Sequence, residues 1–306
     1  MLIVTLPALY KEDLVERVLS DDLVDGVRLN IGAKNQYKSA KEAIEAVLSI
    51  IGDRTLFIDV KGRQLRVAKW TIPPFGNIEL NHEFSVDLPA KIIFRGGDES
   101  EIRIISGKVI YVDPDPREAL GEGQAVNIHG NNLKIFEYLT PEDVEYINAA
   151  AELGVHKYML SFVEEMSDIS DVLALDPKAE IYLKIESQKG LEFVRREYPA
   201  LKRNVRLIFA SDDGYINIGD DKTEIFDALD LVIKSDPDAI AASRILTSLE
   251  RSETVSMQDL LSLRYLESIG FRSFMLSDGL SSRMAIFERA ISVMRQYQNR
   301  TNNNPA

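Results

Sequence analysis

The ten residues from Ile181 to Gly190, IYLKIESQKG, contain the two side chains whose types and spacing could most readily do chemistry. Lys184 and Glu186 stand two positions apart at the end of an apolar run that is typical of a β-strand. Side chains at i and i+2 of a strand point to the same face, so an ammonium and a carboxylate would project together. Alone, such a pair also fits a solvated ion pair on an edge strand. Its meaning therefore depends on the elements that position it.

Length, composition and charge limit the classes of function. The 306 residues, 45% of them hydrophobic, can form one large α/β barrel or two ordinary domains. The 49 acidic and 36 basic residues argue against a general binder of nucleic acid or anionic membranes, but allow a local basic pocket. Because there is no cysteine, disulfides and thiolate chemistry are excluded, and the three histidines have no metal-ligand spacing. No apolar run could span a bilayer and no signal peptide is recognised, so we expect a cytoplasmic protein.

Short apolar runs alternate with longer amphipathic stretches along most of the chain, a pattern typical of parallel βα units. We therefore predict an α/β fold in which eight strands close into a (β/α)8 TIM barrel. The predicted strands are 2–6, 26–30, 56–60, 157–161, 181–185, 205–210, 239–242 and 273–276. The clearest predicted helices are 38–51, 141–153, 223–234, 256–268 and 282–297.

The segment from residue 67 to residue 138 does not show this alternation of strands and helices. It contains short alternating runs such as EFSVDL, EIRII and KVIYV, separated by Pro, Gly and Asn, and no convincing helix. We predict that it forms a small all-β domain inserted after the third barrel strand. The barrel would then comprise residues 1–66 and 139–299, and residues 300–306 would form a disordered tail.

Active-site groups of a (β/α)8 barrel lie at the carboxyl ends of the strands or in the loops that follow them. Applied to the predicted strands, this rule brings many ionisable groups to one rim. Glu186 and an aspartate would offer oxygen ligands to a hard divalent cation, beside basic residues suited to phosphate. The predicted rim residues are Arg28, Asn30, Asp59, Lys61, Lys184, Glu186, Asp212, Asp213, Ser243, Arg244, Ser277 and Asp278.

These segments resemble pyruvate kinase, in the same order and along nearly the whole chain. GVRLNIG at 26–32 resembles that family's strand ending in R-x-N-F-S, and FIDVKGRQLR at 57–66 resembles its D-T-K-G-P-E-I-R segment. LKIESQKG is similar to K-I-E-N-x-E-G, AIAASRILTSL resembles the A-T-Q-M-L-E-S-M segment, and FMLSDG resembles M-L-S-G-E. The insert falls where the family has its mobile lid domain. The resemblance implies a phosphotransferase that converts phosphoenolpyruvate and ADP to pyruvate and ATP.

Carried over residue by residue, the resemblance implies roles for most of the rim. Glu186 and Asp213 would hold Mg²⁺ or Mn²⁺, with Asp212 as an alternative to Asp213. Lys184 would stabilise charge on the phosphoryl group in flight. Ser243 aligns with a hydroxyl implicated in substrate carboxylate binding and proton delivery. The residues implied to bind substrate or nucleotide are Arg28 (also assigned to catalysis), Asn30, Asp59, Lys61, Arg66 and Asp212.

The potassium site of the family is only partly matched. Asn30 and Asp59 agree with it, but Gly32 and Val60 replace its serine and threonine. A potassium requirement is therefore not expected. Because Arg63 lies in the segment that resembles D-T-K-G-P-E, we hypothesise that a fixed guanidinium takes the place of the mobile cation.

Two other functions fit the same residues. A divalent-metal aldolase or lyase acting on a 2-oxo acid would use the same Glu and Asp, and a non-catalytic paralogue would explain why Ser211-Asp212-Asp213 replaces R-G-D. The insert and Lys184 favour the kinase, since a lyase needs neither an ADP lid nor a phosphoryl clamp. The chain shows no counterpart of the family's C-terminal regulatory domain, so we expect no sugar-phosphate activation. A homo-oligomer is compatible with the resemblance.

Overall fold

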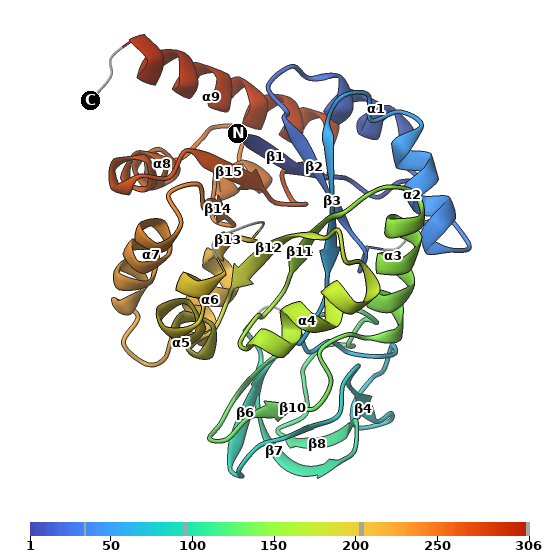
Figure 1. Ribbon diagram of the computed structural model, residues 1–306. Helices are drawn as coiled ribbons and strands as arrows, with labels where there is room; N and C mark the ends of the chain where they lie inside the picture. The colour runs from blue at the N-terminus through green and yellow to red at the C-terminus, as the bar shows by residue number, and fades with distance from the viewer. Residues whose placement is uncertain (34, 95–96, 202–204, 304–306) are drawn as a thin grey trace.

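The computed structural model describes residues 1–33, 35–94, 97–201 and 205–303. Its largest part is a closed barrel of eight parallel strands surrounded by helices, which is consistent with the predicted TIM barrel (Figure 1). The predicted barrel strands are confirmed to within one residue at each end. Around the barrel their order is β1 (Leu2–Thr5), β2 (Gly26–Asn30), β3 (Thr55–Val60), β11 (Lys157–Leu160), β12 (Glu180–Ile185), β13 (Val205–Ala210), β14 (Ile240–Ala242) and β15 (Ser273–Leu276).

Helices cover the outside of the barrel. The five predicted helices are α2 (Ala40–Leu48), α3 (Pro141–Glu152), α7 (Glu224–Ser235), α8 (Met257–Ile269) and α9 (Met284–Asn303). α9 includes the first residues of the expected disordered tail, while residues 304–306 lie outside the described part. The other helices are α1 (Glu12–Ser20), α4 (Met166–Leu175), α5 (Gln188–Arg196), α6 (Ser211–Asn217) and the short 3₁₀ turns Tyr198–Ala200 and Thr247–Glu250. None of the helices described has the length and apolar character needed to cross a membrane.

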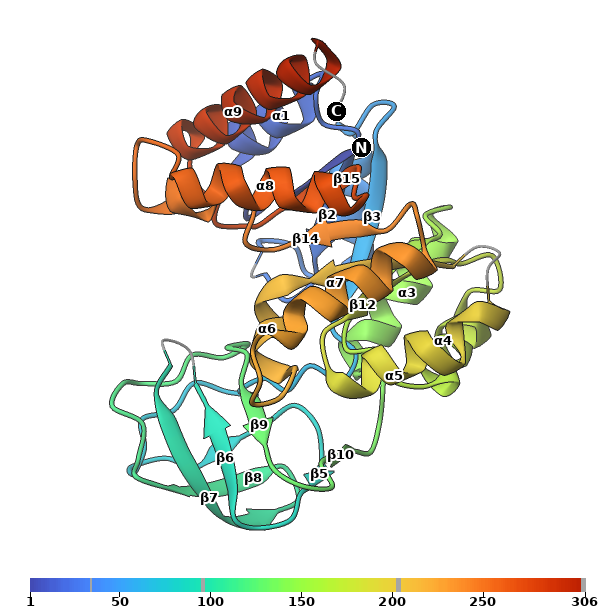
Figure 2. The ribbon, with the colours of Figure 1, turned by 90° about the vertical axis from the view of Figure 1, so that its left-hand side faces the viewer.

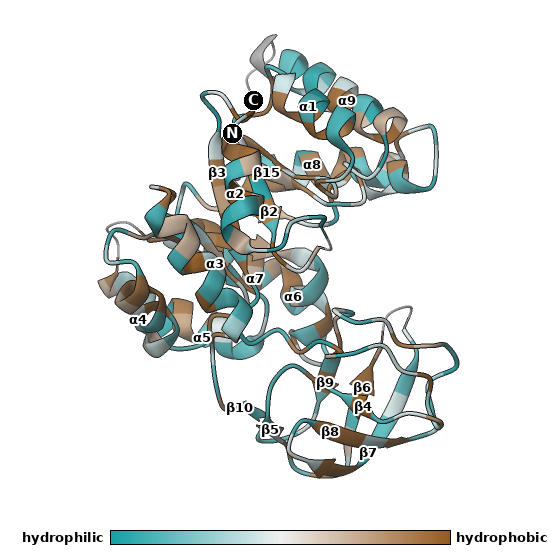
Figure 3. Cartoon of the chain, turned by 90° about the vertical axis from the view of Figure 1, so that its right-hand side faces the viewer, coloured by the Kyte–Doolittle hydropathy of each residue, from teal (hydrophilic) through white to brown (hydrophobic). Residues whose placement is uncertain are grey.

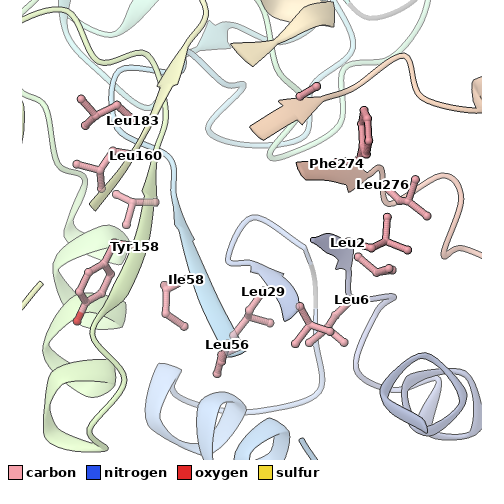
Figure 4. Packing of buried hydrophobic residues seen from close by; sticks show 14 of the residues in the cluster. Leu2, Leu6, Leu29, Leu56, Ile58, Tyr158, Leu160, Leu183, Phe274 and Leu276 are labelled. Carbon is pink, nitrogen blue, oxygen red and sulfur yellow. The ribbon is translucent and has the colours of Figure 1, made fainter. Parts of the chain in front are cut away.

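Alternate residues of the barrel strands belong to two different cores. Outward-pointing side chains pack against the helices, and Figure 4 shows part of this cluster, including Leu29, Ile58 and Leu160. Inward-pointing side chains, among them Ile3 and Phe57, fill the barrel itself. Because a strand repeats every two residues, the positions two residues further along the same strands also point inward, toward the carboxyl end. Those positions carry Thr5, Asp59 and, two residues after Tyr182 on β12, Lys184.

Between β3 and α3 the chain forms short antiparallel strands, here called the β region (residues 67–138). One sheet has the order β4-β8-β7-β6-β9, and β5 pairs with β10 (Figures 1 and 2). Buried side chains such as Leu80 and Ile92 form a hydrophobic cluster separate from the barrel core, and Figure 3 shows hydrophobic stretches along β6 and β8. Since β3 leads directly into this region, the carboxyl ends of the parallel strands face it. The strands are β4 (Ile78–Glu79), β5 (Phe84–Ser85), β6 (Ala90–Ile93), β7 (Glu99–Ser106), β8 (Val109–Asp113), β9 (Asn127–His129) and β10 (Lys134–Ile135).

Three turns at the opposite, amino-terminal end of the barrel are each closed by a buried aspartate. Asp21, Asp176 and Asp236 directly follow α1, α4 and α7, and all three are buried. In each case the carboxylate accepts a hydrogen bond from the backbone N–H two residues later, at 3.0, 3.0 and 3.1 Å. An aspartate that closes such a turn stops the helix and fixes the direction of the chain toward the next strand.

Asp176→Asn is expected to lower the free energy of unfolding by about 2 kcal/mol at pH 7, because Tyr158 and His156 lose a charged acceptor. Burial raises the pKa of Asp176, but the hydrogen bonds from His156 and Tyr158 outweigh it and leave the pKa below its ordinary value. The stabilisation is therefore present above an unfolded pKa of about 4 and is lost as the pH falls through the lower folded pKa.

Urea denaturation of the wild type and of Asp176→Asn at pH 7 and pH 3.5 measures the difference between their free energies of unfolding. This difference should be smaller at pH 3.5. Asp171→Asn, which changes an exposed carboxylate of the same helix, is the matched control and should leave stability nearly unchanged. A difference between wild type and Asp176→Asn that stays constant with pH would count against the ionised carboxylate as its cause.

Candidate functional site

Four charged side chains meet inside the carboxyl end of the barrel. Arg28 Nη2 lies 2.5 Å from Asp59 Oδ2, and Lys184 Nζ lies 3.1 Å from Asp59 Oδ1. Lys184 Nζ also lies 3.6 Å from Glu186 Oε1. Asp59, Lys184 and Glu186 are only 3%, 5% and 1% exposed, and β12 has a neighbouring strand on each side. A solvated ion pair on an edge strand is therefore the wrong interpretation of Lys184 and Glu186.

Two groups that orient this cluster were not predicted from the sequence. Thr5 on β1 accepts a hydrogen bond from Arg28 Nη1 at 3.1 Å, and its hydroxyl donates to the Leu276 carbonyl at 2.9 Å. The backbone N–H of Phe162 donates to Glu186 Oε2 at 2.8 Å. Phe162 does so with a left-handed φ of 50°, which is strained for a bulky residue and is typical of functional sites. Strand alternation from Ile3 could have placed Thr5, but nothing in the sequence indicates the conformation of Phe162.

The charges in the cluster shift one another's ionisation. Burial raises the pKa of Asp59, but the neighbouring Arg28 and Lys184 lower it by more than burial raises it. The net pKa lies below the ordinary value, so the ionised carboxylate is stabilised. Burial raises the pKa of Glu186 to about 7; Lys184 opposes this rise and Asp213 adds to it. Asp59 is thus neutralised by protein cations, while Glu186 retains affinity for a further positive charge.

The structure separates the roles of the two adjacent aspartates. The segment Ser211–Asp213, which directly follows β13, forms the first turn of α6. Burial raises the pKa of Asp213, whose charge interacts with those of Lys184 and Glu186. The side chain of Asp212 is 52% exposed and forms an ion pair with Arg244 Nε at 2.7 Å. Asp213, and not Asp212, is therefore placed to act together with Glu186.

The donor atoms fit a hard divalent cation that is only partly coordinated by protein. Two neighbouring carboxylates, Glu186 and Asp213, are oxygen ligands of the kind that Mg²⁺ and Mn²⁺ prefer. The described residues contain no group of three or more His, Cys, Asp or Glu side chains that could hold a metal. Mg²⁺ usually keeps several waters and binds through one or two carboxylates plus substrate oxygens, so a third protein ligand is not required.

Neither family models nor curated sequences identify the family of this chain. No family model matches it, and no curated protein is significantly similar to it in sequence. The side chains of the site and the motifs in which they occur are therefore what indicates its function.

The other predicted residues Arg66, Asn30 and Lys61 have partners of their own outside the four-residue cluster. Arg66 donates to the Gly123 carbonyl at 2.7 Å and interacts electrostatically with Asp59. Asn30 Oδ1 accepts from the Gly32 N–H at 3.0 Å. The Lys61 ammonium forms an ion pair with Glu142, and its backbone N–H donates to Asp143 Oδ1 at 2.8 Å.

Ser243 follows β14 with a left-handed φ of 63°, and the next residue, Arg244, has a φ of 51°. Two successive non-glycine residues in this conformation indicate a strained loop at the rim. Within the part of the chain that the structure describes, the Ser243 hydroxyl makes no hydrogen bond to the charged cluster. The structure thus brings Arg28, Asp59, Lys184 and Glu186 into direct contact, and leaves Ser243 outside that contact.

Arg63 does not face the position expected for a fixed cation. Its guanidinium forms ion pairs with Asp168 and Glu165 at the start of α4 and lies 5.2 Å from the ring centre of Tyr138. The hypothesis that Arg63 replaces potassium is wrong for this reason. A side chain at Gly32 would instead meet Lys61 and Arg66, so these residues lie beside the position at which the resemblance would put a potassium ligand.

Proposed function

We propose that the protein transfers a phosphoryl group between phosphoenolpyruvate and ADP, as pyruvate kinases do. The observation that carries this proposal is the buried ammonium of Lys184, held between Asp59 and Glu186 at the carboxyl end of the barrel. Phosphoryl transfer has a loose anionic transition state that depends on positioning and electrostatic stabilisation more than on a nucleophile. A fixed cation in a water-poor site supplies that stabilisation without reorganisation.

A bound divalent cation would be held by Glu186 and Asp213 and would neutralise negative charge on the enolate and phosphoryl oxygens. Lys184 would face the phosphoryl group in transit. Arg28 is held in place by Asp59 and Thr5, so its guanidinium would orient an anionic substrate at the same rim. These roles need no covalent intermediate on the protein.

The second substrate would occupy a cavity of about 540 Å³ between the barrel and the β region. Lys38, Lys61 and Arg66 line it, and so do Tyr37 and Tyr146; the acidic residues Glu122, Glu142 and Glu145 line it as well. Basic side chains suit the phosphates of ADP, and an aromatic ring suits a planar base. This combination favours the kinase over a 2-oxo acid lyase, because a lyase has no use for a nucleotide cavity.

The β region would act as a small inserted all-β domain that closes over the barrel. Its strands follow the strand that carries Asp59, and its own hydrophobic cluster allows it to move as a unit. Closure would exclude water, which otherwise competes with ADP for the phosphoryl group.

Pyruvate formation from phosphoenolpyruvate, ADP and Mg²⁺ is the direct test, run in parallel in potassium and sodium salts. We expect turnover, with equal rates in both salts, because Arg66 and Lys61 already lie beside the incomplete potassium site. Strict potassium dependence would contradict the second expectation alone. An inactive wild type that still binds Mn²⁺ with oxalate would favour the lyase, and one that binds neither would exclude both enzymes.

A further inference from the structure

One segment of the β region is hydrogen-bonded to α5, which follows Glu186, and to α6, which contains Asp213. Asn217 of α6 donates to Asn127 Oδ1 on β9 at 3.0 Å, and Lys189 of α5 donates from its ammonium to the Leu133 carbonyl at 2.6 Å. α5 begins two residues after Glu186, and α6 contains Asp213 in its first turn. Figure 2 shows β9 directly beside α6.

The amide of Asn217 has a second partner on its own helix. Its Nδ2 also donates to the main-chain carbonyl of Asp213 at 2.9 Å. One amino group therefore joins the backbone that carries the Asp213 carboxylate to the side chain of Asn127. If β9 moved away from the barrel, this group would lose one of the two acceptors that fix its position.

The bond from Lys189 also joins the β region to a helix, but it is exposed to solvent. It crosses from the start of α5 to the turn after β9, and the Lys189 side chain is 58% exposed. Both contacts border a cavity of about 790 Å³ between the β region and the barrel, which Phe162 also lines. Phe162 is the residue whose N–H binds Glu186, so the same cavity borders the supports of both carboxylates.

We propose that Asn217 and Lys189 are positioning residues through which the β region, when seated on the barrel, holds Asp213 and Glu186 in the arrangement that binds the divalent cation. This inference rests on the proposed function, because it needs those carboxylates to be metal ligands. Coupling of this kind is reciprocal: contacts that favour metal binding are themselves strengthened by the bound metal. If open and closed forms exchange, removing a contact lowers the apparent affinity by lowering the closed fraction.

Mn²⁺ binding, followed by electron paramagnetic resonance, tests the coupling without any need for turnover. A neutral hydrogen bond corresponds to a roughly threefold to tenfold change in an equilibrium constant. Asn217→Ala should therefore raise the Kd for Mn²⁺ roughly threefold to tenfold, and Lys189→Met should raise it less because its bond is exposed to solvent. Asn127→Ala removes the Asn217 bond from the other side without altering α6. It should also raise the Kd, but by no more than Asn217→Ala, which loses the bond to the Asp213 carbonyl as well.

Gln188→Ala is the matched control. Gln188 neighbours Lys189 but bonds to Glu224 within the barrel at 2.8 Å, so its loss should leave the Kd unchanged. Hydrogen exchange gives the reciprocal measurement: Mn²⁺ should slow exchange of the backbone amides at 127–133 in the wild type, and much less in Asn217→Ala.

The outcomes separate the two claims. If the wild type binds Mn²⁺ but Asn127→Ala binds it equally well, Asn217 acts only within its helix and the coupling is refuted. The same conclusion follows if Mn²⁺ leaves exchange at 127–133 unchanged in the wild type. If the wild type itself binds no Mn²⁺, the proposed metal pair fails first and the inference fails with it. Circular dichroism melting of each variant shows that an altered Kd does not reflect unfolding.

Discussion

Lys184→Met is expected to lower kcat for pyruvate formation about a hundredfold to a thousandfold. Methionine keeps a long unbranched side chain but removes the ammonium that would face the transferred phosphoryl group, and removal of one preorganised donor from such a site commonly costs 10²- to 10³-fold. The KM for each substrate should change much less, because the lost interaction strengthens only in the transition state. Steady-state kinetics with purified enzyme give both quantities.

The matched control is Lys157→Met. Lys157 at the start of β11 forms an ion pair with Glu180 at the start of β12, whereas Lys184 lies near the other end of β12. The chemical change is therefore identical, but the site is distant. It should retain nearly full activity. If Lys184→Met unfolds at the same urea concentration as the wild type and still turns over at a comparable rate, Lys184 is not the catalytic cation.

Glu186→Gln is expected to weaken Mn²⁺ binding about a hundredfold or more. The amide has nearly the same shape and its oxygen can still accept from the Phe162 N–H, but the negative charge is lost. Substitutions next to metal ligands commonly cost 10- to 100-fold in affinity, and the loss of a ligand's charge should cost at least as much. Isothermal titration with Mn²⁺, at a pH above 8 where Glu186 is ionised, measures the change.

Glu180→Gln serves as the control for this experiment, because it makes the same replacement at the start of β12, where the ion pair with Lys157 is half exposed. It should bind Mn²⁺ like the wild type. If Glu186→Gln and Glu180→Gln bind Mn²⁺ with equal affinity, Glu186 is not a metal ligand, and Asp213 has no second carboxylate beside it.

The barrel could be predicted because its strands are short apolar runs whose periodicity depends only on local sequence. The rule that active groups follow parallel strands then brought Arg28, Asp59, Lys184 and Glu186 to one rim, where the structure brings them into contact. The first turn of α6 was missed because Ser211, Asp212 and Asp213 are typical of loops and helix starts alike.

The partners of long side chains could not be predicted in the same way. Arg63 and Arg66 stand in the same short segment, and sequence alone gives no reason why Arg63 turns to Asp168 while Arg66 stays near Asp59. That choice depends on α4, which is about 100 residues away along the chain. The left-handed Phe162 is a similar case, because its strain is held by the surrounding fold and not by its own preference.

The buried aspartates at the amino-terminal end of the barrel matter for how this protein could change over evolutionary time. Asp21, Asp176 and Asp236 secure three helix-to-strand turns at the end opposite the charged cluster. These three acids are therefore different residues from Glu186 and Asp213 and lie at the other end of the barrel. Substitutions around Glu186 or Arg244 can alter what the rim binds while the barrel keeps the turns that close it. Such a division makes the chain a tolerant scaffold for acquiring new substrates.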